Sequence, residues 1–181
     1  MKIIATQIPD VLILEPAVYS DERGFFFESF NQKKFEETTK LKVHFVQDNQ
    51  SHSLKGVLRG LHYQIQQPQG KLVSVAEGKI FDAAVDLRRS SPTFGKWTGI
   101  TLSAENKKQI WIPQGLAHGF LALSETATVL YKVTGYYAPQ HERTLIWNDP
   151  DIGIVWPAGW SPILSGKDRL GLRLSQAESF E

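Results

Sequence analysis

The stretch Val57-Leu58-Arg59-Gly60-Leu61-His62-Tyr63-Gln64 is the most informative part of this sequence. Its pattern is that of a buried β-strand, yet it contains an arginine and a histidine, and Lys71 follows soon after. Cationic side chains are rarely buried without a partner or a function. Three of them so close together predict a pocket that takes an anionic ligand and moves a proton.

Similar strand patterns recur along the chain. Turn residues such as Glu77-Gly78 and Ser90-Ser91-Pro92 separate them. Short strands with regular turns are typical of an antiparallel sandwich or barrel, so we expect an all-β fold. The predicted strands are Val11–Leu14, Phe25–Phe30, Val43–Val46, Val57–Gln64, Lys71–Ala76, Ile80–Leu87, Trp97–Leu102, Gln109–Ile112, Gly119–Leu123, Ala127–Val133 and Thr144–Trp147.

Helices are expected to be few, short and peripheral. Asn31 can cap a helix over Gln32–Thr39, in which Phe35 is the apolar contact. The stretch Pro150–Gly166 is rich in Pro, Gly and Trp, and we expect an ordered loop there. No repeat or linker divides the sequence, so residues 1–181 are predicted to form a single domain.

Composition argues against several classes of protein. The chain has 20 basic and 19 acidic residues, whereas nucleic-acid-binding domains usually carry a clear excess of Lys and Arg. It has no cysteine, which excludes disulfides, thiolate catalysis and cysteine metal sites and fits a reducing compartment. The sequence lacks a signal-peptide pattern and any apolar run of roughly 20 residues. We therefore expect a soluble cytoplasmic protein.

Side-chain alternation raises a question about Arg59 and His62. Strict alternation would send them to opposite faces of a strand. Glycine inside a strand often marks a bulge, and a bulge at Gly60 would bring both side chains to one face. The alternative is that His62 is a structural histidine bonded to the backbone.

Two further polar residues are expected to point into the fold. Lys71 alternates with Val73 and Val75, and Tyr131 lies on one face with Val129 and Val133. A lysine inside a sheet needs an anion, and a buried tyrosine hydroxyl needs a partner. The alternatives are a lysine that extends to water at the strand end and a core tyrosine with one hydrogen bond.

Asp82 and Asp86 share a face of one predicted strand. For Asp86 we expect a solvated position with Arg88 or Arg89 as an ion-pair partner. Asp82 lies nearer the centre of the strand, and its role stays open.

The turn Pro113-Gln114-Gly115-Leu116-Ala117-His118 resembles the second signature of the cupin barrels, whose histidine usually binds a metal. The His-x-His of the first cupin signature is missing, because Tyr63 and Gln64 follow His62. Two histidines without a carboxylate make a poor divalent metal site. The sequence therefore indicates a cupin shape without a metal.

Together these motifs resemble the dTDP-4-dehydrorhamnose 3,5-epimerase family over nearly the whole chain. The matching positions, in the family's order, are Asp21–Phe26, Gln47–Asn49, Leu58–Gln64, Lys71, Asp82, Pro113–His118, Tyr131 and Lys167–Arg169. The resemblance implies a cupin jelly roll, a homodimer and no metal or organic cofactor. It also implies conversion of dTDP-4-dehydro-6-deoxy-D-glucose to dTDP-4-dehydro-L-rhamnose, a step towards dTDP-L-rhamnose.

The resemblance also implies roles for individual residues. His62 matches the general base, Asp168 its orienting carboxylate, Tyr131 the general acid and Lys71 the residue that stabilises the enolate. The matching substrate contacts are Arg59, His118 and Lys167, several near the diphosphate, the thymine-stacking Tyr137, the nucleotide contacts Gln47, Asp48, Asn49 and Glu142, the partner-chain contacts Arg23 and Glu28, and Phe26 and Asp82.

Three alternatives remain from the sequence. An epimerase that acts at one carbon only, or on a related dTDP-4-ketosugar, would use the same residues. A metal-dependent cupin enzyme is disfavoured by the missing His-x-His and is tested by metal analysis and chelation. A non-catalytic cupin that only binds a sugar nucleotide is disfavoured by the intact acid, base and lysine, and is tested by a turnover assay.

Overall fold

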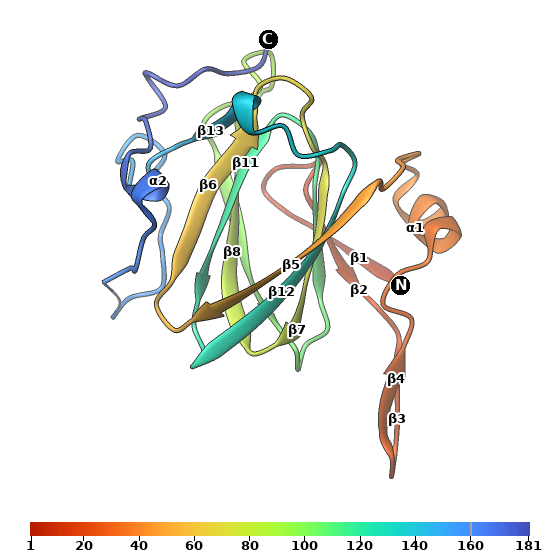
Figure 1. Ribbon diagram of the computed structural model, residues 1–181. Coiled ribbons are helices and arrows are strands. Elements are labelled where there is room, and N and C mark those ends of the chain that lie inside the picture. The colour runs from red at the N-terminus through yellow and green to blue at the C-terminus, as the bar shows by residue number, and fades with distance from the viewer. Residues whose placement is uncertain (160) are drawn as a thin grey trace.

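The computed structural model describes residues 1–159 and 161–181. Two antiparallel sheets face each other and enclose the core, as in a jelly-roll barrel (Figure 1). The first sheet has the strand order β1 (Lys2–Ala5), β2 (Leu12–Glu15), β10 (Gln109–Ile112), β7 (Lys71–Glu77), β12 (Thr126–Val133), β5 (Gln47–Leu54). The second has the order β13 (Glu142–Thr144), β6 (Leu58–Gln64), β11 (Leu116–Ala122), β8 (Lys79–Asp86), β9 (Trp97–Ser103).

The remaining elements lie outside these two sheets. Strands β3 (Val18–Asp21) and β4 (Gly24–Phe27) form a hairpin that projects away from the barrel (Figure 1). Helix α1 (Gln32–Thr39) lies beside the first sheet, and the short α2 (Gly166–Arg169) lies outside the second. A 3-10 turn, η1, covers Pro139–His141. The all-β prediction with short peripheral helices is confirmed.

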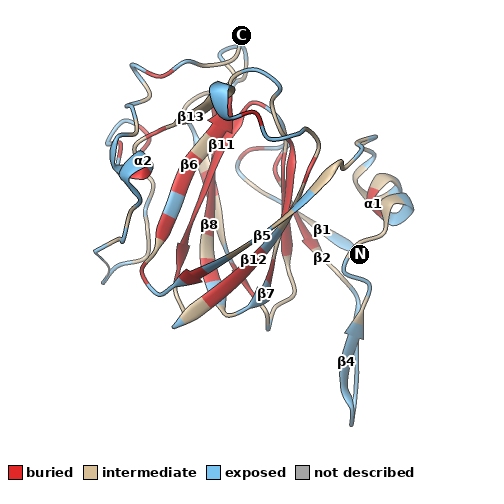
Figure 2. Ribbon diagram, in the orientation of Figure 1, coloured by how far each residue is buried: buried red, intermediate tan, exposed pale blue. Residues whose placement is uncertain are grey.

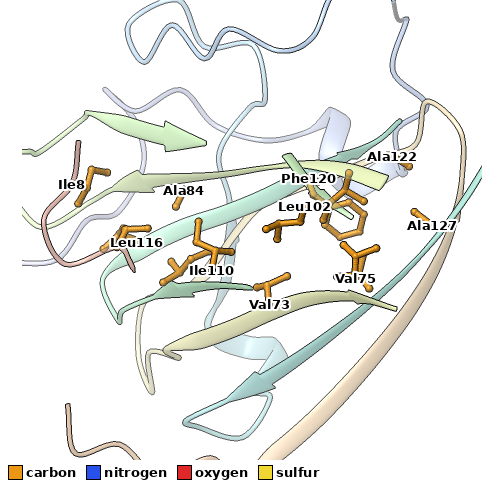
Figure 3. Close-up of a cluster of buried hydrophobic side chains, with 14 residues drawn as sticks. Ile8, Val73, Val75, Ala84, Leu102, Ile110, Leu116, Phe120, Ala122 and Ala127 are labelled. Carbon is orange, nitrogen blue, oxygen red and sulfur yellow. The ribbon is translucent and has the colours of Figure 1, made fainter. Parts of the chain in front are cut away.

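The core lies between the sheets, where Val73, Ile110, Leu116 and Phe120 belong to one cluster of buried side chains (Figure 3). Every second residue of a strand points to the same face, which explains why Val73 and Val75 are both buried. Figure 2 shows buried residues along both sheets and exposed residues along the β3–β4 hairpin. Part of the inner surface carries polar residues instead, and there a pocket opens.

The helix over Gln32–Thr39 is confirmed with its predicted bounds. The Asn31 side chain accepts a hydrogen bond from the Lys34 backbone N–H at 3.1 Å, as an N-cap should. Phe35 is fully buried against Phe45 and Trp111 in edge-to-face contacts. One apolar side chain thus attaches α1 to the first sheet.

Other predictions differ from the structure. Val43–Val46 is not a strand, because Val43 and Phe45 pack against the α1 cluster while the backbone stays irregular. Strands β1, β3 and β5 were not predicted. β5 is polar up to its last residue, Leu54, because alternate residues of the strand face the pocket rather than an apolar core.

The described residues of the stretch Pro150–Gly166 contain neither helix nor strand before Gly166. Trp160 lies outside the described residues. The expected loop is otherwise confirmed. Within the described part of the chain, no helix combines the length and the hydropathy that a membrane crossing requires.

Candidate active site

A pocket of about 670 Å³ opens between the two sheets. The predicted catalytic residues His62, Lys71, Tyr131 and Asp168 all line it. So do seven of the predicted substrate contacts: Gln47, Asn49, Arg59, His118, Tyr137, Glu142 and Lys167. The structure therefore brings together residues that lie up to 121 positions apart in the sequence, from Gln47 to Asp168.

A bulge in β6 directs two of these side chains into the pocket. His62 pairs with His118 of β11, and Arg59 pairs with Phe120. Between these two pairs β6 contains one more residue than β11, which is the register shift of a bulge. Gly60 has φ = +127°, and a Cβ there would lie 2.5 Å from Cα of Gly119. The predicted bulge at Gly60 is confirmed, and only glycine fits it.

His62 forms a short hydrogen bond with Asp168. Its Nε2 lies 2.5 Å from Oδ1 of Asp168. Because a carboxylate only accepts hydrogen bonds, Nε2 carries the proton and Nδ1 is left as the acceptor in the neutral ring. Burial lowers the pKa of His62 below 6.5, although the bond to Asp168 opposes this shift. A neutral imidazole at pH 7 can accept a proton from a ligand.

Helix α2 holds Asp168 in place. Ser165 caps this helix, and its hydroxyl donates to Oδ2 of Asp168 at 2.7 Å. Burial acts to raise the pKa of Asp168, but its hydrogen bonds to His62 and Ser165 outweigh burial and lower the pKa below 3.8. Asp168 is therefore a fixed anion that orients the imidazole.

Tyr131 faces the pocket from the other sheet. It lies on β12, whereas His62 lies on β6. Burial raises the pKa of the Tyr131 phenol above 10, so the hydroxyl keeps its proton at neutral pH. None of the described residues forms a hydrogen bond with this hydroxyl, so it remains available to a ligand. The predicted inward orientation is confirmed, and Val129 and Val133 on the same face are fully buried.

Lys71 is the buried cation of the pocket. On β7 it is paired with Val133, which places it diagonally from Tyr131 on the same sheet. Its ammonium lies 3.4 Å from the backbone oxygen of His62. Burial lowers its pKa from 10.5 to about 8, while Asp82 and Glu142 act to raise it. The ammonium is thus a charged donor at neutral pH, and its inward orientation is confirmed.

Two more cations, Arg59 and Lys167, line the pocket. Arg59 donates to the Ser53 hydroxyl at 3.0 Å and to the His52 backbone oxygen at 3.1 Å, which fixes its guanidinium. Lys167 pairs with Glu142 at 2.7 Å. Arginine and lysine are the usual side chains for phosphate recognition.

Glu142 contacts both Lys167 and Tyr137, an aromatic residue of the pocket lining. The Tyr137 hydroxyl donates to Glu142 at 2.9 Å, and the ring of Tyr137 is largely exposed. Burial acts to raise the pKa of Glu142, but hydrogen bonds from Lys167 and Tyr137 outweigh it and hold the pKa below 4.5. The exposed ring can stack on a flat ligand, as predicted for Tyr137.

Asp82 is not among the residues that line the pocket. It is fully buried, and its Oδ2 lies 2.8 Å from Nε2 of His118. Its predicted contact with the substrate stays a prediction. Asp86 is also fully buried, so its predicted solvated position is wrong, because Arg88, Ser91 and Thr93 hydrogen-bond its carboxylate. The expected ion pair with Arg88 is confirmed at 2.8 Å.

Four other predicted contacts lie away from this pocket. Asp48 pairs with Lys132 on the outer side of β5 and β12, because alternation turns it away from Gln47 and Asn49. Arg23 and Phe26 are exposed on the β3–β4 hairpin, and Glu28 follows it. Their expected role involves a partner chain, which this single chain does not test.

Sequence reasoning missed three polar residues of the site. Ser51 lines the pocket with a buried hydroxyl that has no partner among the described residues. Gln64 donates to the backbone oxygens of Gln67 and Tyr136, and Ser165 supports Asp168. The pattern Ser165-x-x-Asp168, a helix-capping signature, could have identified Ser165.

No group of three or more His, Asp and Glu side chains capable of holding a metal ion occurs within residues 1–159 and 161–181. The chemistry available in the pocket is that of a neutral imidazole, a phenol and an ammonium group. These groups can remove a proton, supply a proton and stabilise a developing oxyanion, respectively.

Comparison with known proteins places the chain among its relatives. The sequence profile of the family described as dTDP-4-dehydrorhamnose 3,5-epimerase matches residues 5–176. Enzymes of that name from Pseudomonas aeruginosa and Salmonella typhimurium are 59% identical over 180 residues and 60% identical over 178 residues. These alignments cover 99% of this chain and 99% of the first relative, and 98% of this chain and 97% of the second.

A solved structure is similarly close. The crystal structure of a dTDP-6-deoxy-D-glucose-3,5-epimerase from Legionella pneumophila, in complex with dTDP-4-keto-L-rhamnose, has a TM-score of 0.95 and 54% identity to this chain. The superposition covers 98% of this chain and 94% of that one. Fold and sequence agree, and the chain belongs to the dTDP-4-dehydrorhamnose 3,5-epimerase family.

Proposed function

We propose that this protein inverts C3 and C5 of dTDP-4-dehydro-6-deoxy-D-glucose and so forms dTDP-4-dehydro-L-rhamnose. The observation that carries the proposal is a His–Asp pair and a tyrosine on opposite walls of one pocket, with a buried lysine between the same sheets. Both reacting carbons are α to the C4 ketone, so loss of either proton gives an enolate. Such an enzyme needs a base on one face of the ring and an acid on the other.

His62 is the base in this proposal. Its Nδ1 accepts the proton from C3 or C5 while Asp168 holds Nε2–H and stabilises the imidazolium that forms. The lowered pKa of His62 keeps the ring neutral before the transfer, because an imidazolium cannot accept a proton. A positioned base of this kind typically contributes about 10²–10⁴-fold to the rate.

Tyr131 is the acid. It faces the pocket from β12, so it can protonate the enolate on the face that His62 does not reach. Its raised pKa keeps the phenol protonated when the enolate forms. The configuration of the carbon inverts because the proton leaves towards one sheet and is replaced from the other.

Lys71 stabilises the enolate oxygen. The charge that develops on the C4 oxygen needs a preorganised donor, and a buried ammonium acts more strongly there than it would in water. By analogy with oxyanion-hole donors, it is worth roughly 3–4 kcal/mol of transition-state stabilisation.

The rest of the pocket matches a nucleoside diphosphate. Arg59 and Lys167 supply the positive charge for the diphosphate, and the ring of Tyr137 offers a stacking surface for thymine. Gln47 and Asn49 are hydrogen-bonded to each other at 2.8 Å on the same wall and can read polar atoms of the nucleotide.

We also propose a homodimer in which the β3–β4 hairpin of one protomer reaches the site of its partner. The support is a projecting arm with the exposed side chains Tyr19, Phe25 and Phe26, together with the highly exposed Arg23. Large apolar side chains gathered on an arm indicate a protein contact. In a closed two-fold symmetric dimer, each active site would receive the β3–β4 hairpin of the other protomer.

Mixing two inactive variants tests this exchange of arms. His62→Ala destroys its own site, and Arg23→Ala with Phe26→Ala weakens the arm. A mixed dimer has one site with both an intact His62 and an intact arm, so refolding the two together restores about a quarter of the sites by random pairing. No recovery of activity, or a monomer by light scattering, would refute the arm exchange.

A cytoplasmic location and a single domain over residues 1–181 are part of the same proposal. Their support is the cysteine-free composition and the absence of a composition break along the chain. Cell fractionation tests the first. Limited proteolysis tests the second, with a single resistant fragment as the expected result.

The decisive test of the reaction is proton NMR of dTDP-4-dehydro-6-deoxy-D-glucose with the enzyme in deuterated water. We expect the C3 and C5 proton signals to disappear and the L-configured product to form. Loss of one signal alone would indicate a single-site epimerase. Retention of both signals by the folded protein would refute the proposed function.

A further inference from the structure

Asp82 is a fully buried carboxylate with a single hydrogen bond. Its Oδ2 interacts with His118, and its Oδ1 is buried without a partner among the described residues. Its neighbours across the strands are Phe120 on β11 and Ile100 on β9. A charge in such a place is costly unless other groups in the fold compensate it.

The compensating charge comes from the opposite sheet. Asp82 and Lys71 interact electrostatically across the interior, although no ion pair within 4 Å joins them. Asp82 is the strongest of the charges that favour the ammonium form of Lys71. The family resemblance implies a substrate contact for Asp82, whereas in the structure its charge favours the ammonium form of Lys71.

We propose that Asp82 is a positioning residue that keeps Lys71 protonated and fixes the ring of His118 in the pocket. This rests on the proposed function, in which Lys71 must be charged to stabilise the enolate. The bond from Nε2–H of His118 to Asp82 leaves Nδ1 of His118 towards a ligand. Asp82 therefore serves the reaction without touching the sugar.

Several charged groups besides Asp82 affect the protonation of Lys71. Asp82 on β8 and Glu142 on β13 favour the ammonium, and Lys167 on α2 opposes it. His62 on β6 interacts with Lys71, but it is neutral in the active form. His118 on β11 lines the same pocket and is bonded to Asp82. Removal of Asp82 leaves Glu142, itself paired with Lys167, as the remaining anion that favours a charged Lys71.

The direct test is ¹⁵N NMR titration of the Lys71 side chain without substrate, assigned by its loss in Lys71→Met. In the unaltered protein we expect a midpoint at about pH 8. Asp82→Asn has nearly the same shape without the charge, and we expect it to lower the midpoint by about one pH unit or more. This readout is independent of turnover, so its failure is separate from a failure of the proposed function.

Kinetics supply the second test. The alkaline limb of the kcat/KM profile, which reports the free enzyme, should follow Lys71 and move to lower pH by the same amount in Asp82→Asn. Asp86→Asn is the matched control, because Asp86 is equally buried on the same strand but bonds Arg88, Ser91 and Thr93 outside the pocket. It should lose thermal stability and keep the position of the limb.

An unchanged Lys71 midpoint in Asp82→Asn, with activity reduced equally at every pH, would overturn the proposal and leave Asp82 a structural role. If Asp82→Asn does not fold, the unaltered protein decides. A Lys71 side chain that is already neutral at pH 7 would contradict the proposal, and a charged one would support it.

Discussion

The pairs His62–Asp168 and His118–Asp82 contain the same two chemical groups, and their histidines are opposite each other on β6 and β11. They differ in the origin of the carboxylate. Asp168 comes from α2, outside both sheets, and leaves 24% of the His62 side chain exposed. Asp82 comes from the adjacent strand β8 and leaves 9% of His118 exposed.

Because His62 is more exposed than His118, the two His–Asp pairs are expected to have different roles. An imidazole with a carboxylate behind it and an open face in front can exchange protons with a ligand. An imidazole whose carboxylate lies within the sheet is held in one orientation and serves mainly to position a ligand. The neighbouring histidines are therefore expected to respond differently to the same substitution.

The largest difference is expected for alanine at the two histidines. His62→Ala should lower exchange of the C3 and C5 protons with solvent by about 10²–10⁴-fold, the usual contribution of a positioned base. His118→Ala should bind substrate more weakly but retain exchange at saturation. Proton NMR in deuterated water measures both. Full exchange in His62→Ala would show that His62 is not the base. Loss of exchange only in His118→Ala would make His118 the base instead.

Asparagine at the two carboxylates should separate the pairs by pH. As the pH rises, the active fraction of the unaltered enzyme first increases, because His62 loses its proton with a pKa below 6.5. At higher pH the active fraction falls again, because Lys71 loses its proton with a pKa of about 8. Asp168 raises the pKa of His62, so Asp168→Asn should move the acid limb to lower pH and leave the alkaline limb in place. The profile of kcat/KM against pH checks this.

Asp168→Asn should also lower kcat, by about 10²-fold, because the imidazole loses its orientation. Asp82→Asn provides the comparison, since it is expected to move only the alkaline limb. If both variants moved the same limb, the two pairs would not have separate roles.

The smallest effect is expected beyond both pairs, at Gln64. It bonds the backbone of Gln67, Tyr136 and Ala138, and so holds the segment that carries Tyr137. Gln64→Ala should raise KM by about 5–10-fold, equivalent to the roughly 1 kcal/mol of one hydrogen bond, with kcat nearly unchanged. The exposed Gln50 on β5 gives the control, Gln50→Ala. Steady-state kinetics that show a fall in kcat instead would assign Gln64 to the chemistry.

Local signals in the sequence predicted much of the fold. The cap at Asn31 and the apolar Phe35 defined α1, and the apolar run Gln109–Ile112 defined β10. Gly60 predicted the bulge that turns Arg59 and His62 to one side. These features depend on neighbouring residues, and local physics is sufficient for them.

Other parts depend on tertiary contacts and could not be predicted from local pattern. β5 is too polar to be recognised as a strand, because its inner face lines a pocket. Asp86 has the pattern of a solvated residue, yet Arg88 and two hydroxyl groups satisfy it inside the protein. Asp168 reaches His62 across 106 residues, a contact that only the resemblance to a family suggested.

In the proposed mechanism base and acid approach the sugar from opposite sheets, and Tyr131→Phe tests this arrangement most directly. The substitution removes one oxygen from a partly buried ring whose hydroxyl bonds no described residue. His62 should still remove the C3 and C5 protons, and deuterium from solvent should return to the same face. Proton NMR of the recovered sugar should show exchange without inversion. Inverted product at the unaltered rate would contradict the account.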